Sequence, residues 1–265
     1  MSASSELKPQ PLDLGKHLSL DAWRGLAALA VVLFHCVDLM PKALSAACGW
    51  VSQAFSYGYL GVNLFFPISG YCILNALTLS ERAGFWGFFR RRLWRIYPAY
   101  WGSLLMIYLV IILAKPFNGT SLVELDMPWW EWLSLLTLTQ GFVKPGIVNV
   151  VYWTLGLEVQ FYLVMGCLLF FKPHWRPWLL LLTAVLSSVY RMPWWPWHIQ
   201  GLFLEYWLEF LVGAAVIGWR IPAYGPRWSM MIMGHCHHYG GCDLEPGADC
   251  QPGGLFSVAD LLPMG

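Results

Sequence analysis

The chain has 265 residues, of which 58% are hydrophobic, 17% are aromatic and only 12% are charged. Soluble domains carry about a quarter charged residues, so this composition excludes an ordinary soluble protein and indicates an integral membrane protein. The formal net charge is +1, and the sequence has no basic tail of the kind that binds nucleic acid.

The first apolar run, residues 18–40, follows a polar segment of residues 1–17 that we expect to be a cytoplasmic tail. This run predicts an uncleaved spanning helix that carries Arg24 and His35, eleven positions apart. At ~100° and ~1.5 Å per residue, the two lie on one face and roughly 16 Å apart along the axis. Ionisable groups are costly in a bilayer, which favours a function. The alternative is that Arg24 snorkels to the cytoplasmic edge and His35 only packs.

Two further apolar runs, residues 59–79 and 97–113, predict the second and third spans. Between them lies the densest positive cluster of the chain, which consists of Arg82, Arg90, Arg91, Arg92 and Arg95. The positive-inside rule places this cluster in the cytoplasm, and the amino terminus with it, because two spans separate them.

The segment 129–142 decides the topology of everything after it. It is too short to cross comfortably. If it crossed, the basic residues at positions 172, 176, 220 and 227 would lie outside; if it is interfacial or re-entrant, they lie inside. The charge rule favours the second arrangement, with three more spans at residues 150–171, 178–189 and 202–219. We therefore predict an all-α, polytopic transmembrane bundle of about six spans plus a re-entrant or interfacial helix.

A glutamate, Glu158, interrupts the fourth span. On the chosen topology it lies roughly 12 Å below the outer end of its helix, and His35 roughly 8 Å below the outer end of the first span. A buried carboxylate needs a partner, and His35 is the candidate at similar depth. The alternative is a bond that only locks helices, to Tyr162 one turn away or to an arginine.

The last segment, residues 221–265, is polar and rich in glycine and proline, and we expect a disordered tail. Its HCHHYGGC run, residues 235–242, contains three histidines and two cysteines. The run lacks the spacing of a closed metal site, so we expect no metal centre.

Four stretches in this order resemble the bacterial membrane acyltransferase family of the acyltransferase-3 type, which modifies cell-surface sugars. LDAWRGLAALAVVLFH is similar to the first helix of that family, GVNLFFPISGYCI to the second, FFRRRLWRIYPAYW to its R-x-x-R segment and YWTLGLEVQFYL to its tryptophan-to-glutamate motif. The matching positions are Arg24, His35, Arg92, Arg95, Trp153 and Glu158. The resemblance covers residues 18–220. Since the family typically has about ten spans, the chain looks C-terminally truncated, and a partner chain could supply the missing spans.

The resemblance implies transfer of an acyl group, expected to be acetyl from acetyl-CoA at the cytoplasmic side, to a carbohydrate hydroxyl outside the plasma membrane. His35 would be the general base or a transient carrier of the acyl group, and Glu158 would orient it. Arg92 and Arg95 would grip the CoA phosphates, and Arg24 would contact the donor. Two alternatives stay open: arginines that only set orientation, and a non-catalytic remnant or proton-coupled transporter built from the same residues.

Overall fold

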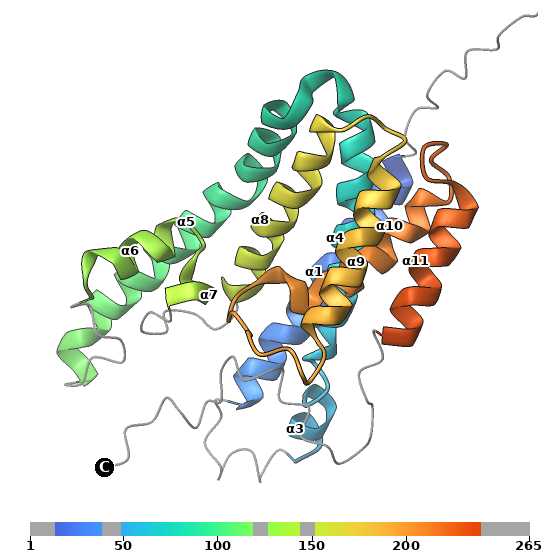
Figure 1. The fold of residues 1–265 in the computed structure, drawn as a ribbon. Coiled ribbons are helices and arrows are strands. Elements are labelled where there is room, and N and C mark those ends of the chain that lie inside the picture. Colours follow the sequence, from blue (N-terminus) through green and yellow to red (C-terminus); the bar gives the residue numbers. More distant parts are fainter. Residues whose placement is uncertain (1–13, 39–48, 119–126, 144–151, 240–265) are drawn as a thin grey trace, which may run out of the picture. The chain divides into compact units, whose positions relative to one another are not determined.

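The computed structural model describes residues 14–38, 49–118, 127–143 and 152–239, and the regular elements in these ranges are all helices. In chain order they are α1 (Leu14–Asp38), α3 (Gly49–Phe55), α4 (Leu60–Leu79), η1 (Glu81–Ala83), α5 (Gly84–Asn118), α6 (Trp129–Leu136), α7 (Gln140–Val143), α8 (Tyr152–Cys167), η2 (Leu168–Phe170), α9 (Arg176–Tyr190), η3 (Phe203–Tyr206), α10 (Trp207–Gly218) and α11 (Gly225–Tyr239) (Figure 1). The all-α prediction is confirmed. The chain divides into two compact units, Met1–Ile68 and Ser69–Gly265, each described by itself below.

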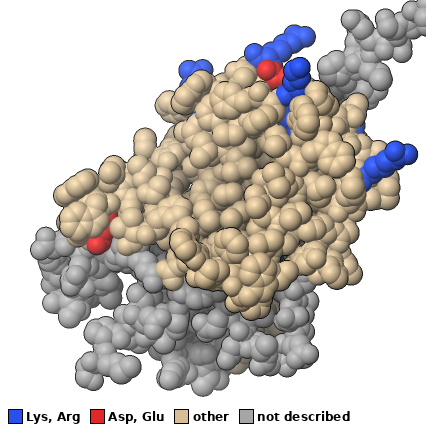
Figure 2. All heavy atoms as spheres, viewed as in Figure 1, with Lys and Arg blue, Asp and Glu red and all other residues tan. Residues whose placement is uncertain are grey.

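Four helical stretches among the described residues are long and apolar enough to cross a membrane: Ser19–Val37, Gln53–Leu79, Glu81–Leu113 and Tyr152–Phe170. The fifth and sixth apolar segments form α9 and α10, with 15 and 12 residues, which is short of the ~20 residues that a full crossing needs. Across the described surface in Figure 2, Lys and Arg side chains gather along one edge, and uncharged residues cover the face beside it. This surface suits contact with lipid.

In the first unit, α1 packs closely against the turn that precedes α4 and against the start of α4. A Cβ atom on Gly61 would collide with the carbonyl oxygen of Ala27, and one on Gly58 would collide with that of Ala30. Two glycines three positions apart therefore let the backbones touch, as small residues do at helix interfaces in membranes.

In the second unit, α5 is the longest helix, with 35 residues. At ~1.5 Å per residue it extends roughly 52 Å, more than the ~30 Å hydrocarbon core. The sequence predicts that the arginine cluster lies in a loop before the third span. The structure instead continues the helix through this region from Gly84, so Arg92 and Arg95 lie on the spanning helix itself.

The segment 129–142 forms two short helices, α6 and α7, instead of a span. Aromatic side chains of α5 satisfy the backbone at the end of α6: the Tyr100 hydroxyl donates to the Leu135 carbonyl at 2.5 Å, and the Trp101 indole donates to that of Leu136 at 3.3 Å. The last carbonyls of a helix have no partner within it, so these bonds hold α6 against α5. Neither helix is long enough to cross a membrane, as the sequence predicts, and the re-entrant or interfacial position of the segment stays a prediction.

A single ion pair shows which loops of the second unit share an end. Arg176, which begins α9, donates from Nη1 to Glu81 Oε1 at 2.6 Å, just before α5. The chain therefore leaves this end along α5 and returns to it along α8, which lies beside α5 (Figure 1). A crossing by segment 129–142 would have put the two loops at opposite ends.

The structure places a helix, α11, where the sequence analysis predicts a disordered tail. The Trp228 indole donates to the Pro177 carbonyl at 2.8 Å, and the Cys236 thiol donates to that of Leu208 at 3.5 Å. These bonds join α11 to α9 and α10, along which it packs (Figure 1).

Candidate functional site

Glu158 lies in the interior of the second unit, on α8, and only 1% of its surface is exposed. The hydroxyl of Tyr162, also buried, donates to Glu158 Oε1 at 2.5 Å. Residues four apart on a helix face the same side, so this bond forms within α8. An unpaired carboxylate would be strongly unfavourable here, and the phenol offsets part of that cost. The helix-locking alternative of the sequence analysis is thus present as a contact.

Arg92 reaches the same place from α5. Its guanidinium carbon lies 6.0 Å from the centre of the Tyr162 ring and 5.8 Å from that of Phe88. It also interacts electrostatically with Glu158. A guanidinium over aromatic rings is held by cation–π attraction. We call Arg92, Tyr162 and Glu158 the α5–α8 cluster.

The structure separates the two arginines that the sequence treats alike. Arg92 is half-buried and belongs to the α5–α8 cluster, whereas Arg95, one turn further along α5, is exposed. One residue step rotates a helix position by ~100°, so neighbours three apart can still differ in burial at the edge of a contact.

The other two predicted site residues lie in the first unit, on α1. The Arg24 guanidinium carbon lies 4.9 Å from the centre of the Phe65 ring, and the His35 ring packs edge-on against Phe34 at 5.2 Å. Both side chains are half-buried. The helix runs unbroken from Leu14 to Asp38, so their spacing along one face holds. The pairing of His35 with Glu158 stays a prediction, because the two belong to different units.

A second polar feature of α8, which the sequence analysis leaves without a role, is Gln160. Its amide donates from Nε2 to the Gly201 carbonyl at 2.7 Å and accepts at Oε1 from the Phe203 backbone N–H at 3.1 Å. One side chain thereby fixes the segment that leads into α10. The two partners lie more than 40 positions away in sequence, so no local sequence pattern predicts these hydrogen bonds.

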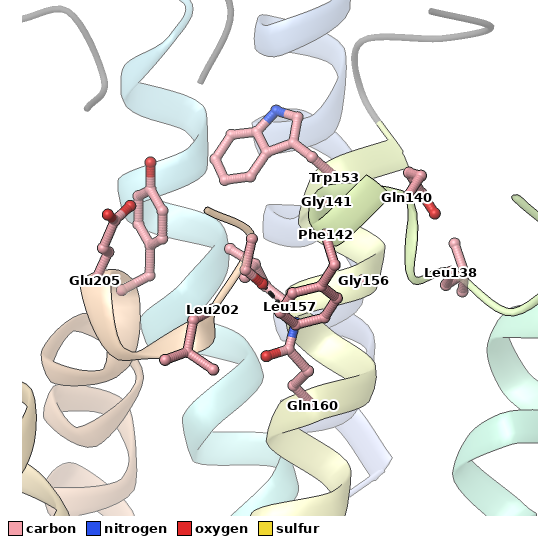
Figure 3. A pocket seen from close by; sticks show the side chains of 12 residues that line it. Leu138, Gln140, Gly141, Phe142, Trp153, Gly156, Leu157, Gln160, Leu202 and Glu205 are labelled. Atoms are coloured by element: carbon pink, nitrogen blue, oxygen red, sulfur yellow. Dashed lines mark hydrogen bonds between the residues drawn. The ribbon is translucent and has the colours of Figure 1, made fainter. Parts of the chain in front are cut away.

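A small crevice opens beside Gln160. Figure 3 shows Phe142 of α7, Trp153 and Gln160 of α8, and Leu202 and Glu205 from the segment before α10 around it. The Trp153 and Tyr206 rings, which both line it, lie 5.2 Å apart. The free space within is about that of one water molecule. The residues that line it are Leu138, Gln140, Gly141, Phe142, Trp153, Gly156, Leu157, Gln160, Gly201, Leu202, Glu205 and Tyr206.

Part of the histidine- and cysteine-rich run contributes to packing. His235 Nε2 lies 2.8 Å from the Ser188 hydroxyl of α9, and Cys236 faces α10. The described residues contain no group of three or more His, Cys, Asp or Glu arranged to hold a metal ion. Cys242, the last residue of the run, lies outside them.

Comparison with known proteins points to one family. The family model of an acyltransferase domain, acyltransferase-3, matches residues 17–237. ORF330 of the Acidianus two-tailed virus, named as an acetyltransferase, is 28% identical over 207 residues, which are 76% of this chain and 55% of that protein. The peptidoglycan O-acetyltransferase OatA of Listeria monocytogenes is 28% identical over 199 residues, 66% of this chain and 29% of the relative.

The O-acetyltransferase OatA of Staphylococcus aureus is 26% identical over 170 residues, 58% of this chain and 25% of its own length. The chain thus spans about half the length of the viral relative and less than a third of either OatA. No solved structure matches it. The family match covers α1 to α11 and includes every motif residue named above. This chain therefore belongs to the acyltransferase-3 family of membrane acyltransferases.

Proposed function

We propose that this chain transfers an acetyl group from acetyl-CoA, at the cytoplasmic face of the plasma membrane, to a hydroxyl of a cell-surface carbohydrate. The names of the OatA relatives, which specify O-acetylation and in one case peptidoglycan, support this substrate class. In the reaction the C–S bond of the thioester breaks and a C–O ester bond forms. The hydroxyl proton passes to a base, and CoA leaves as the thiol.

The observation that carries the proposal is the buried Glu158, the one charged residue of α8. His35 is the general base that takes the hydroxyl proton, and Glu158 orients the imidazole and stabilises its charged form, as the acid of a hydrolase triad does.

Basic residues near the arginine-rich end bind the donor. Arg95 is exposed on α5 and suits charge-assisted contacts to the CoA phosphates. Arg24, near the amino-terminal end of α1, contacts the donor on its way to His35. The amino terminus is cytoplasmic in this arrangement, as the positive-inside rule predicts.

The test is turnover by the chain in proteoliposomes, with radiolabelled acetyl-CoA inside and purified peptidoglycan outside. We expect label on the glycan and release of free CoA. His35→Ala should lower both by about a hundredfold or more, the scale of a lost general base. His237→Ala, at an exposed position on α11, is the matched control and should retain wild-type turnover.

Turnover that survives His35→Ala would remove the assignment of the base. A wild-type chain that inserts normally, yet releases no CoA with any acceptor and does not bind labelled acetyl-CoA, would contradict the proposed function as a whole.

A further inference from the structure

We infer that Arg92 and Tyr162 position the carboxylate of Glu158, so that Arg92 acts on the reaction centre while Arg95 alone of the two serves the donor. This inference rests on the proposed function, since it takes Glu158 as the partner of the catalytic base. It assigns different roles to two arginines that the sequence presents as one motif.

The first step is the hydrogen bond to the carboxylate. Tyr162 donates to Oε1 of Glu158 at 2.5 Å, and each of the two residues has only 1% of its surface exposed. Inside a membrane helix a carboxylate without fixed donors would turn toward whatever dipole lies nearest. The phenol fixes one oxygen and thereby the direction of the other, which is what an orienting group requires.

The second step is the contact between Arg92 and the phenol. The guanidinium lies over the Tyr162 ring at 6.0 Å and near the Phe88 ring at 5.8 Å. A cation over the face of a phenol draws electron density from the ring, so the hydroxyl becomes a stronger donor. Arg92 therefore strengthens the bond from Tyr162 to Glu158.

Arginine and lysine would act differently at position 92. A planar guanidinium can stack on aromatic rings, whereas an ammonium is a compact, strongly hydrated point charge. At a phosphate site, lysine in place of arginine would keep the charge but lose the bidentate contact, so the donor KM would rise. At a stacking site on the path to Glu158, the loss would appear in kcat instead. Arg92→Lys therefore separates the two roles without removing the charge.

The experiment measures kcat and the KM for acetyl-CoA in proteoliposomes. Tyr162→Phe, which removes only the hydroxyl, should lower kcat about tenfold or more, the scale of a hydrogen bond to a charged group. Arg92→Lys should lower kcat about 3- to 10-fold and leave the donor KM unchanged. Arg95→Lys should raise the donor KM with little change in kcat.

The coupling between the variants provides the sharpest readout. The effects of Arg92→Lys and Tyr162→Phe on kcat should not multiply in the double variant, because both act through one hydrogen bond. The effects of Arg95→Lys and Tyr162→Phe should multiply. Two controls should match the wild type: Arg90→Lys, exposed on α5, and Tyr108→Phe, whose hydroxyl has no hydrogen-bond partner among the described residues.

Failure of the inference and failure of the proposed function give different results. If Glu158→Gln abolishes turnover but Tyr162→Phe and Arg92→Lys keep the wild-type kcat, the inference is wrong and the proposed function stands. A raised donor KM in Arg92→Lys with an unchanged kcat would indicate that Arg92 binds the CoA phosphates, and this result would also overturn the inference. Wild-type turnover in Glu158→Gln would remove Glu158 from the reaction and the inference with it.

Discussion

The ionisable residue whose partners the structure shows most fully is Arg176. Its Nη1 bonds Glu81, and its Nε donates to the carbonyls of Leu168 and Phe171, both at 3.1 Å. The side chain is only 7% exposed, whereas that of Glu81 is 48% exposed. Because the arginine also donates to the carbonyls of the first residue of η2 and of the residue that follows it, its contribution to stability exceeds that of the ion pair alone.

Replacement of either partner should therefore have unequal effects. Arg176→Met should lower the free energy of unfolding by about 2 kcal/mol, since the Phe171 carbonyl loses the Arg176 donor and the Leu168 carbonyl keeps only the Phe171 N–H. Glu81→Gln keeps an acceptor at a half-exposed site and should cost less than about 1 kcal/mol. The measurement is the thermal unfolding midpoint in detergent, with Arg227→Met at an exposed position as control. Equal shifts for the first two variants would show that only the ion pair matters.

At the scale of a helix, α11 is the element that the sequence analysis missed. Its composition is polar, yet Trp228, Ile232 and Cys236 follow one another at intervals of four and are all buried. That interval marks one helix face, and α11 could have been predicted from it. The face packs on α10 so closely that a Cβ on Gly218 would lie 2.5 Å from the Trp228 ring.

Gly218→Val should push α11 away from α10. Burial, with a smaller effect of Glu209, raises the pKa of the Cys236 thiol to about 12, so at pH 8 the thiol stays protonated and resists alkylation. When α11 loosens, the pKa should fall toward the usual value of about 8.5, and more thiolate should react. We expect at least a tenfold faster alkylation of Cys236, followed by mass spectrometry of its peptide.

The control for this helix is Gly234→Ala, since a Cβ at Gly234 meets no atom within 4 Å. Its Cys236 should react as slowly as in the wild type. An unchanged rate in Gly218→Val would mean that α11 does not depend on this contact.

At the scale of the whole molecule, the arrangement of the second unit predicts which of its ends faces the cytoplasm. The Arg176–Glu81 bond puts the loop before α5 and the loop before α9 at one end, and the 15 residues of α9 carry the chain away from it. Positive charge is retained on the cytoplasmic side of a membrane protein, so this end is expected to face the cytoplasm.

Labelling of introduced cysteines with a membrane-impermeant thiol reagent tests this arrangement in intact cells. In a chain whose native cysteines are replaced by serine, Arg82→Cys and Trp175→Cys should both stay unlabelled until the membrane is opened, and Trp197→Cys should react from outside. All three positions are exposed in the structure. If only one of Arg82→Cys and Trp175→Cys reacts from outside, the two loops do not share an end. If both react from outside and Trp197→Cys does not, the loops share an end but the charge-based orientation is wrong.

The sequence by itself determined the helical class, the apolar segments and the motif residues. These depend on local properties: hydropathy over about 20 residues, and the period of a helix, which puts Arg24 and His35 on one face. It also predicted that residues 129–142 do not cross, because the distribution of basic residues in the later loops favoured that arrangement.

The tertiary structure alone decided which side chains meet. Arg176 and Glu81 are 95 positions apart, and Gln160 is 41 from Gly201, so no periodicity links them. The different surroundings of Arg92 and Arg95 depend on where α8 lies against α5. The docking of α11 depends on the surface that α10 presents. Hydropathy indicates which segments leave water. In a low-dielectric interior, however, each polar group is stabilised by the particular donor or acceptor that packing brings within reach.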